Sequence, residues 1–216
     1  MSKNTGHKHI DRAMVFVVDD DDALSDSIAC LLESANLPCK LFADANAFLE
    51  FCTPQHLGCI LLDVRMPGMG GLELQDTLKA NGIVLPVIVI TGHGDVPLAV
   101  RAMKSGAFDF LQKPFNAEAL LERVHAALEQ FEGCRRKNLK RDSLRSHFDA
   151  LSEREREIME FVVAGDSSKV IGMKLGISSR TVDIHRSNIM KKLNVPTIAD
   201  LVRKRMALED DQADPA

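Results

Sequence analysis

The chain has 216 residues, 45% of them hydrophobic and 27% charged, with a formal net charge of −4, a composition typical of a globular protein with one or two domains. No apolar run is long enough to cross a bilayer. Residues 1–12, which we expect to form a flexible tail, lack the apolar stretch of a signal peptide, so we expect a cytoplasmic protein with no membrane partner. The five cysteines include no C-x-x-C pair, which favours free reduced thiols over a disulfide or metal set.

Short apolar runs alternate with segments of helical spacing through the first 130 residues. Strands are predicted at Met14–Val18, Cys39–Phe42, Cys59–Leu62, Val87–Ile90 and Phe108–Leu111. Helices are predicted at Ala23–Ser34, Ala45–Phe51, Leu72–Ala80, Leu98–Ser105 and Ala117–Gln130. This alternation predicts an α/β fold, a doubly wound five-stranded parallel sheet with helices on both faces. Ligands of such folds bind at the carboxyl ends of the strands.

The ends of these predicted strands carry acidic and basic residues. Asp19 and Asp20 follow the first strand, Asp63 the third, Thr91 the fourth and Lys113 the fifth. Carboxylates gathered in a small space repel one another, and a hard cation such as Mg²⁺ relieves that repulsion. A carboxylate beside the ion can then attack a phosphoryl group, whose oxygens the ammonium and the hydroxyl would contact.

Each of these residues has an ordinary explanation when it is taken alone. The run Asp19–Asp22 could be an exposed acidic turn that caps the first helix, Asp63 a turn residue, Thr91 a cap and Lys113 a surface cation. These residues all follow predicted strands, in the order that one edge of a parallel sheet requires, and this favours a single shared site. An alternative is a phosphohydrolase of the haloacid-dehalogenase type, which would use Asp20 and Asp22 after the first strand, although no cap domain is evident.

The second half of the chain is basic and helical. Residues 131–147 hold 6 Lys and Arg against 2 Asp and Glu, and we interpret them as a charged linker that either extends the preceding helix or is mobile. Ser152 and Glu155 form a capping box for a helix that Gly165 can end. A second short helix, capped by Ser167 or Ser168 and closed by Gly176, leads to a third that starts at Ser178 or Ser179, and Pro196 precedes a fourth at Ile198–Leu208. The acidic residues 209–216 are predicted to be disordered.

The third of these helices has two distinct faces. Its inward face is predicted to hold Val182, His185, Ile189 and Leu193. Its outward face is predicted to hold Arg180, Asp183, Ile184, Ser187, Asn188 and Lys191. Such a helix, following a short helix and a tight turn, suits the DNA major groove, where cations contact phosphates or guanine and Ile184 can meet a thymine methyl. Helical hairpins also bind proteins, so the helix faces alone favour DNA only slightly.

Four segments of the first half resemble the receiver domains of response regulators, and especially the FixJ-like subgroup. They read VFVVDDDDAL, LLDVRMPGMGG, VIVITGHGDVPLAV and FDFLQKPF. The resemblance covers residues 13–130 and implies a flavodoxin-like fold in which Asp63 accepts a phosphoryl group. It implies Asp19, Asp20, Asp63 and the backbone carbonyl of Arg65 as ligands for Mg²⁺, or for Mn²⁺, and Thr91 and Lys113 as phosphoryl contacts. Thr91 and Phe110 would form the switch. The chain has four aspartates after the first strand, so Asp21 could compete with Asp20 for the ion.

The C-terminal sequence resembles the LuxR-type helix-turn-helix of FixJ and NarL response regulators, most clearly in SSRTVDIHRSNIMKKL. The resemblance implies a four-helix all-α domain over residues 148–208 that binds DNA as a dimer. The candidate DNA-binding residues are Lys169, Arg180, Thr181, Asp183, Ile184, Ser187, Asn188, Lys191 and Lys192. Gly172 stands where relatives commonly have alanine, and Asp183 where relatives have a cation.

Together these patterns predict a two-component response regulator and transcription factor that is not itself an enzyme. The expected partners are a sensor histidine kinase, promoter DNA, a second copy of the chain on phosphorylation, and RNA polymerase if the protein activates transcription. An interaction protein that uses the receiver scaffold without phosphorylation is the other alternative, and the presence of every group needed for phosphorylation weighs against it.

Overall fold

The computed structural model describes residues 13–92 and 96–213 and divides the chain into two compact units, with the boundary between Cys134 and Arg135. The N-terminal segment 1–12, predicted to be flexible, lies outside the described residues, as do residues 93–95 of the TGHGDVP stretch and residues 214–216. In the part of the chain that is described, no helix is both long and apolar enough to span a bilayer.

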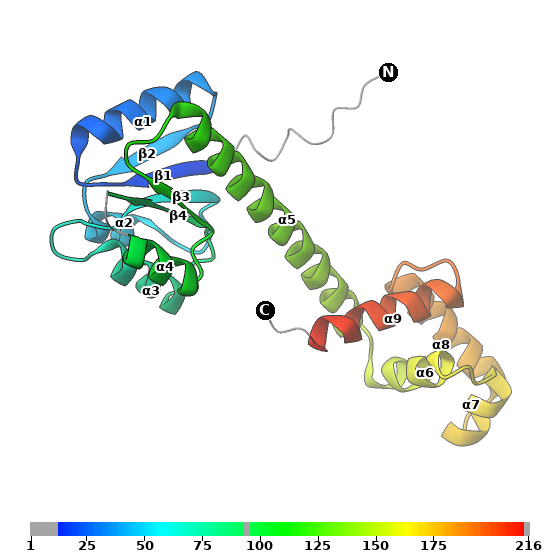
Figure 1. Ribbon diagram of the computed structural model, residues 1–216. Coiled ribbons are helices and arrows are strands. Elements are labelled where there is room, and N and C mark those ends of the chain that lie inside the picture. Colours follow the sequence, from blue (N-terminus) through cyan, green and yellow to red (C-terminus); the bar gives the residue numbers. More distant parts are fainter. Residues whose placement is uncertain (1–12, 93–95, 214–216) are drawn as a thin grey trace, which may run out of the picture. The chain divides into compact units, whose positions relative to one another are not determined.

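The first unit is built around a five-stranded parallel sheet with the strand order β2-β1-β3-β4-β5 (Figure 1). The strands are β1 (Met14–Val18), β2 (Cys39–Phe42), β3 (Gly58–Asp63), β4 (Val87–Thr91) and β5 (Asp109–Gln112). The helices between and after them are α1 (Asp22–Ser34), α2 (Ala45–Phe51), α3 (Gly71–Ala80), α4 (Val96–Lys104) and α5 (Ala117–Asp149). The predicted strands and α1 to α4 all occur, with bounds that differ by at most two residues.

Two apolar layers cover the two faces of the sheet, because successive residues of a strand point to opposite sides. Val15, Val17, Leu61 and Ile90 belong to the layer that includes the buried faces of α1 and α5. The alternate strand residues, such as Phe16, belong to the layer beneath α2, α3 and α4. Figure 1 shows α1 and the start of α5 on one side of the sheet and the other three helices on the opposite side. The predicted doubly wound fold is therefore confirmed.

The second unit has its own core and is entirely helical. Its complete helices are α6 (Glu153–Val163), α7 (Ser168–Leu175), α8 (Ser179–Lys192) and α9 (Ile198–Ala213). The N-caps are Ser152, in a capping box with Glu155, then Ser167 and Ser178, and Gly176 ends α7 in the left-handed conformation. The core joins these helices through residues that include Ile158, Ile171, Val182, Ile189 and Leu201.

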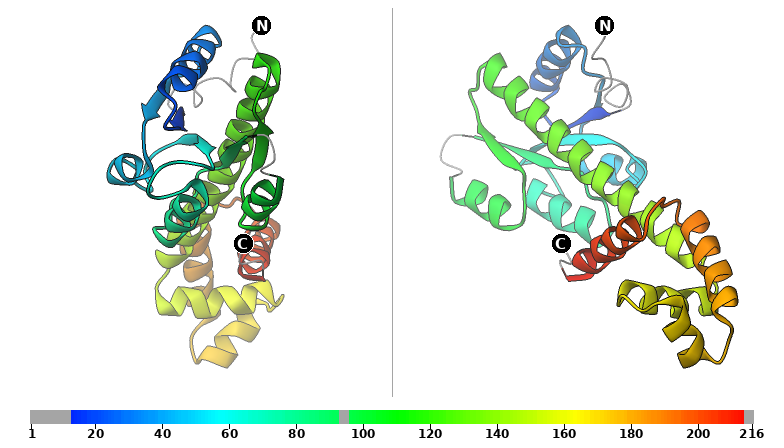
Figure 2. Two further views of the ribbon diagram at one scale, coloured as in Figure 1. Left: turned by 60° about the vertical axis from the view of Figure 1, so that its left-hand side comes forward. Right: turned by 90° about the vertical axis from the view of Figure 1, so that its right-hand side faces the viewer.

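Two helices extend beyond their predicted ends at Gln130 and Leu208. Residues 131–147, for which a mobile linker was one alternative, are part of α5, which Figure 2 shows as one unbroken helix. Arg, Lys and Leu favour helices, and the run contains no proline to interrupt one already formed. The C-terminal residues predicted to be disordered are helical as far as Ala213. Here too no glycine or proline follows Ile198 before the helix ends, so elongation continues into the acidic residues.

Candidate functional site

The carboxyl edge of the sheet gathers the acidic and basic residues that follow the strands. Asp63 and Thr91 are the last residues of β3 and β4, and Asp19 and Lys113 come directly after β1 and β5. Because the strands are parallel, these ends meet at one edge. Asp19, Asp63 and Thr91 are only 2%, 6% and 3% exposed, so the two carboxylates need partners inside the protein.

The ammonium of Lys113 is the partner that the two carboxylates share. Its Nζ lies 2.9 Å from Asp19 Oδ2 and 2.6 Å from Asp63 Oδ1. The second oxygen of Asp63 accepts the backbone N–H of Arg65 at 2.6 Å. The backbone N–H of Lys113 donates to the Thr91 carbonyl at 2.7 Å, which ties the end of β5 to β4. The structure thus brings Asp19, Asp63, Thr91 and Lys113 together.

Burial and charge act in opposite directions on this cluster. Burial raises the pKa of Asp63, and the nearby charge of Asp19 raises it further, while hydrogen bonds from Lys113 and Arg65 lower it in part. For Lys113, burial lowers the pKa, but the hydrogen bonds to Asp63 and Asp19 outweigh that effect and raise it. Lys113 therefore stays charged, and two carboxylates share one ammonium, which leaves a negative site.

The neighbouring aspartates are placed differently from one another. Asp20 is exposed directly beside Asp19. Asp21 is the N-cap of α1 and accepts the backbone N–H of Leu24 at 3.1 Å, so its carboxylate has a structural role there. Among the described residues, no group of three or more His, Cys, Asp or Glu side chains is arranged to hold a metal ion. The donors near Lys113 are nevertheless all oxygens, the atoms that Mg²⁺ prefers.

Phe110, the predicted switch residue, lies in the middle of β5 with 42% of its surface exposed. Its backbone pairs in register with Val89 of β4, and its carbonyl accepts Arg123 Nε at 3.1 Å. The aromatic ring therefore lies at the surface in this structure, on the strand next to the one that ends in Thr91.

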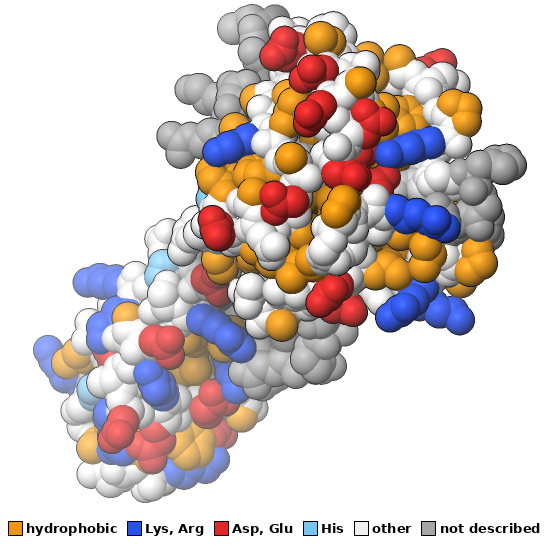
Figure 3. Space-filling view, turned by 90° about the vertical axis from the view of Figure 1, so that its left-hand side faces the viewer, with side chains coloured by type: hydrophobic (Ala, Val, Ile, Leu, Met, Phe, Trp, Pro, Cys, Tyr) orange, Lys and Arg blue, Asp and Glu red, His pale blue; other side chains and the backbone are white. Residues whose placement is uncertain are grey.

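Most of the candidate DNA-binding side chains lie at the surface of the second unit. The exposed ones include Lys169, Arg180, Ile184, Ser187, Asn188 and Lys191. The opposite face of α8 is buried at Val182 and Ile189, as the helical spacing predicts. In the view of Figure 3 both units show side chains of both signs, and on the second unit Lys and Arg side chains lie among Asp and Glu side chains over the whole visible face. The cations of the second unit are thus available to a polyanionic partner.

Three of the candidate DNA-binding residues have partners within their own domain. The hydroxyl of Thr181 lies 2.8 Å from the hydroxyl of Ser178, the residue that caps α8. Lys192 Nζ donates to Glu155 Oε2 at 2.7 Å and to the Ala150 carbonyl at 3.2 Å, which joins α8 to the start of α6. Asp183 Oδ1 accepts a hydrogen bond from the hydroxyl of Ser168, the first residue of α7, at 2.6 Å. The contact of Thr181 is local to the start of α8, whereas those of Lys192 and Asp183 depend on the angles between helices, so no periodicity in the sequence identifies them.

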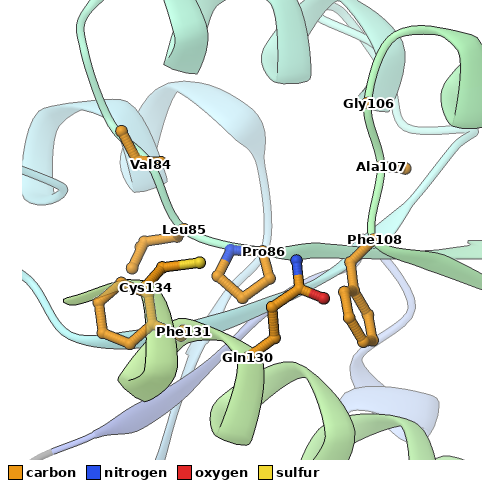
Figure 4. Close-up of a pocket in the computed structure, with 9 residues that line it drawn as sticks. All are labelled: Val84, Leu85, Pro86, Gly106, Ala107, Phe108, Gln130, Phe131 and Cys134. Carbon is orange, nitrogen blue, oxygen red and sulfur yellow. The ribbon is translucent and has the colours of Figure 1, made fainter. Parts of the chain in front are cut away.

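A separate hollow of about 330 Å³ lies at the amino ends of β4 and β5 (Figure 4), at the opposite edge of the sheet from Asp63. Val84 and Phe108 line it from the connections before these strands, and Phe131 and Cys134 line it from α5. Its lining consists of apolar residues, Gln130 and one thiol, so it offers no charged group for phosphoryl chemistry. All five cysteines of the chain are free thiols, as predicted.

Comparison with known proteins assigns each half of the chain to a domain family. Residues 15–125 match the response regulator receiver domain, and residues 149–205 match the bacterial regulatory proteins of the luxR family. The chain is 46% identical over 202 residues to the transcriptional regulatory protein FixJ of Azorhizobium caulinodans, which covers 94% of this chain and 96% of that protein. It is 41% identical over 208 residues to the response regulator protein TodT of Pseudomonas putida, which covers 95% and 92% of the two chains.

Solved structures agree with this assignment. The response regulator StyR superposes with a TM-score of 0.87 at 42% identity, over 91% of this chain and 99% of that one. Full-length FixJ from B. japonicum superposes with a TM-score of 0.58 at 41% identity, over 92% and 98%. The chain therefore belongs to those transcriptional response regulators that join a receiver domain to a LuxR-type DNA-binding domain.

Proposed function

We propose that Asp63 is the phospho-accepting residue and that its phosphorylation by a sensor histidine kinase controls DNA binding by the second unit. The observation that carries the proposal is the position of Asp63, buried at the carboxyl edge of the sheet with its Oδ1 on the Lys113 ammonium. A carboxylate oxygen of Asp63 attacks the phosphorus, and the bond from phosphorus to the kinase histidine breaks. Lys113 and the Thr91 hydroxyl then contact the transferred phosphoryl oxygens.

Asp19, Asp20, Asp63 and the Arg65 carbonyl would hold Mg²⁺, or Mn²⁺, beside this acceptor. The oxygen-only donors and the negative charge left after pairing with Lys113 fit such an ion. When bound, the ion supplies positive charge that neutralises the phosphoryl oxygens. The Asp21 carboxylate is bonded at the start of α1, which favours Asp20 over Asp21 as the further ligand.

The response to phosphorylation would pass from Thr91 to Phe110 and then to the domain that binds DNA. Thr91 would move toward the phosphoryl group, and Phe110 would turn inward from its exposed position. Dimerisation would then place two copies of α8 on paired half-sites of promoter DNA. The exposed cations Lys169, Arg180 and Lys191 would contact the DNA. RNA polymerase is a further partner if the protein activates transcription. A sensor kinase, promoter DNA and RNA polymerase as partners would place the protein in the cytoplasm.

An enzyme of the haloacid-dehalogenase type is less well supported. It would use Asp20 and Asp22 as its acidic pair, and both are exposed, with Asp22 the first residue of α1. The Lys113 ammonium contacts Asp19 and Asp63 instead. This pairing supports Asp63 over Asp20 as the phospho-accepting residue.

The direct test is phosphorylation with a small donor. The full chain is incubated with acetyl phosphate and Mg²⁺, and the phosphoryl group is detected by intact mass spectrometry. We expect one phosphoryl group on the wild type and on Asp76→Asn, which removes an exposed carboxylate of α3 outside the site, and none on Asp63→Asn. Equal labelling of Asp63→Asn, or no labelling of the wild type, would contradict the proposal.

A further inference from the structure

One hydroxyl of α7 joins two charged side chains of α8. Ser168 Oγ donates a hydrogen bond to Asp183 Oδ1 at 2.6 Å. Arg186 Nη1 donates to the same Ser168 Oγ at 2.9 Å. The hydroxyl therefore acts both as donor and as acceptor, which is the full use of its single proton and one of its lone pairs. We refer to Ser168, Asp183 and Arg186 as the Ser168 bridge.

The position of the bridge makes it a link between the scaffold helix and the helix proposed to read DNA. Ser168 is the first residue of α7, and Asp183 and Arg186 lie three residues apart on α8. Side chains with that spacing are neighbours on one helix face. Hydrogen bonds to ionised groups are shorter and stronger than those between neutral groups. The bridge thus joins the start of α7 to the second turn of α8.

A second close contact restrains the same two helices. Gly172 is buried in the middle of α7, and a Cβ at this position would lie 2.7 Å from the Ile177 carbonyl oxygen and 3.3 Å from the Ser179 backbone nitrogen. The backbone N–H of Ile177 also donates to the Gly172 carbonyl at 3.0 Å. The start of α8 is therefore held against the backbone of α7, while the bridge holds the next turn of α8.

We propose that Asp183 is a positioning residue that sets the orientation of α8 on DNA through Ser168, and that it does not read a base. The carboxylate already accepts a hydrogen bond within the domain, and its negative charge is unfavourable close to DNA phosphates. The neighbouring exposed residues Arg180 and Ile184 are the ones that the bridge would hold in register with the base edges. This inference rests on the proposed function, because it assigns a role within DNA binding.

The experiment compares Ser168→Ala, Asp183→Ala and the double variant in the full chain treated with acetyl phosphate and Mg²⁺. The probe is the DNA duplex that the wild type selects from a randomised pool. Each single variant is expected to bind it about tenfold more weakly, the size of one lost specific contact. The double variant should bind no more weakly than either single variant, since one bridge is broken in all three. The matched control is Ser167→Ala, which removes the neighbouring hydroxyl that caps α7 but leaves the bridge, and its effect should add to that of Asp183→Ala.

Sequence preference separates positioning from direct contact. Repeating the selection with Ser168→Ala and with Asp183→Ala should yield the same relaxed preference over several base pairs, whereas loss of a phosphate contact weakens all sequences alike. Asp183→Asn, which keeps the acceptor oxygen, should retain the wild-type preference. A change at one base pair in Asp183→Ala alone, or additive effects in the double variant, would overturn the inference. A wild type that selects no sequence would overturn the proposed function, and the inference with it.

Discussion

Replacement of Gly172 by alanine tests how closely α7 and α8 are packed. In a helix, alanine is favoured over glycine by about 1 kcal/mol. At this position, however, the added methyl would lie 2.7 Å from the Ile177 carbonyl oxygen. Overpacking of this kind costs about 1–3 kcal/mol, and the cost should be near the upper end because the opposing atom belongs to the backbone of a hydrogen-bonded turn. We expect a net loss of about 1 kcal/mol in the stability of the second unit.

Gly133 is the matched control for this substitution. It lies inside α5, and a Cβ there would meet no atom within 4 Å. Gly133→Ala should therefore keep the propensity gain of about 1 kcal/mol without an overpacking cost. The two substitutions make the same chemical change in a helix, and the structure predicts effects of opposite sign.

Unfolding would be followed by far-UV circular dichroism, because the chain has no Trp and no Tyr. For the second unit, residues 135–216, about 1 kcal/mol corresponds to a change in Tm of roughly 4–8 °C, whereas Gly133 belongs to the larger first unit, where the change in Tm is smaller. Hydrogen exchange would assign the change in Gly172→Ala to the amides of α7 and α8. Stabilisation of the second unit by Gly172→Ala would refute the close approach of α7 and α8.

Three further predictions concern titratable groups. The hydrogen bond from Lys192 lowers the pKa of Glu155. The stability that ionised Glu155 contributes is therefore present above its unfolded pKa and is lost as the pH falls through its folded pKa. Urea unfolding across the acid range should show this loss of stability, and the loss should be smaller in Glu155→Gln. Lys113→Ala leaves two buried carboxylates unpaired and should cost about 1–3 kcal/mol in metal-free buffer, less than a fully buried pair because Lys113 is 27% exposed; unfolding should show partial recovery with Mg²⁺, and no change at all would refute the pairing. Burial raises the pKa of Cys59 to about 12, so iodoacetamide at neutral pH should modify the exposed Cys30 in the folded chain and Cys59 only after unfolding, as peptide mapping would show.

The sheet and its site were accessible to sequence analysis for a physical reason. Buried parallel strands are continuous apolar runs, and such a run can be recognised wherever it ends. Once the strands are parallel, residues that follow them share one edge, so the convergence of Asp19, Asp63 and Lys113 follows from topology alone. The pairing of Lys113 with both carboxylates does not follow, because it depends on the rotamer of one long side chain.

The helical extensions and the contacts between helices were harder to predict. The basic residues after Phe131 have no regular apolar spacing, yet they continue α5 because an existing helix elongates more easily than a new one begins. Asp183 is an acidic residue at an outward position of α8, which is where a side chain that contacts a base would lie. Only the angle between α7 and α8 brings it to Ser168. Lys192 likewise reaches Glu155 through the packing of α8 on α6.

The central claim is that a phosphoryl group on Asp63 controls DNA binding. The most direct test measures, in one experiment, the oligomeric state by sedimentation and the affinity for a selected DNA duplex, with and without acetyl phosphate and Mg²⁺, for the wild type and Asp63→Asn. The account predicts that the phosphodonor causes dimerisation and tighter DNA binding in the wild type alone. Identical behaviour of the two proteins, with or without the donor, would contradict the phosphorylation switch.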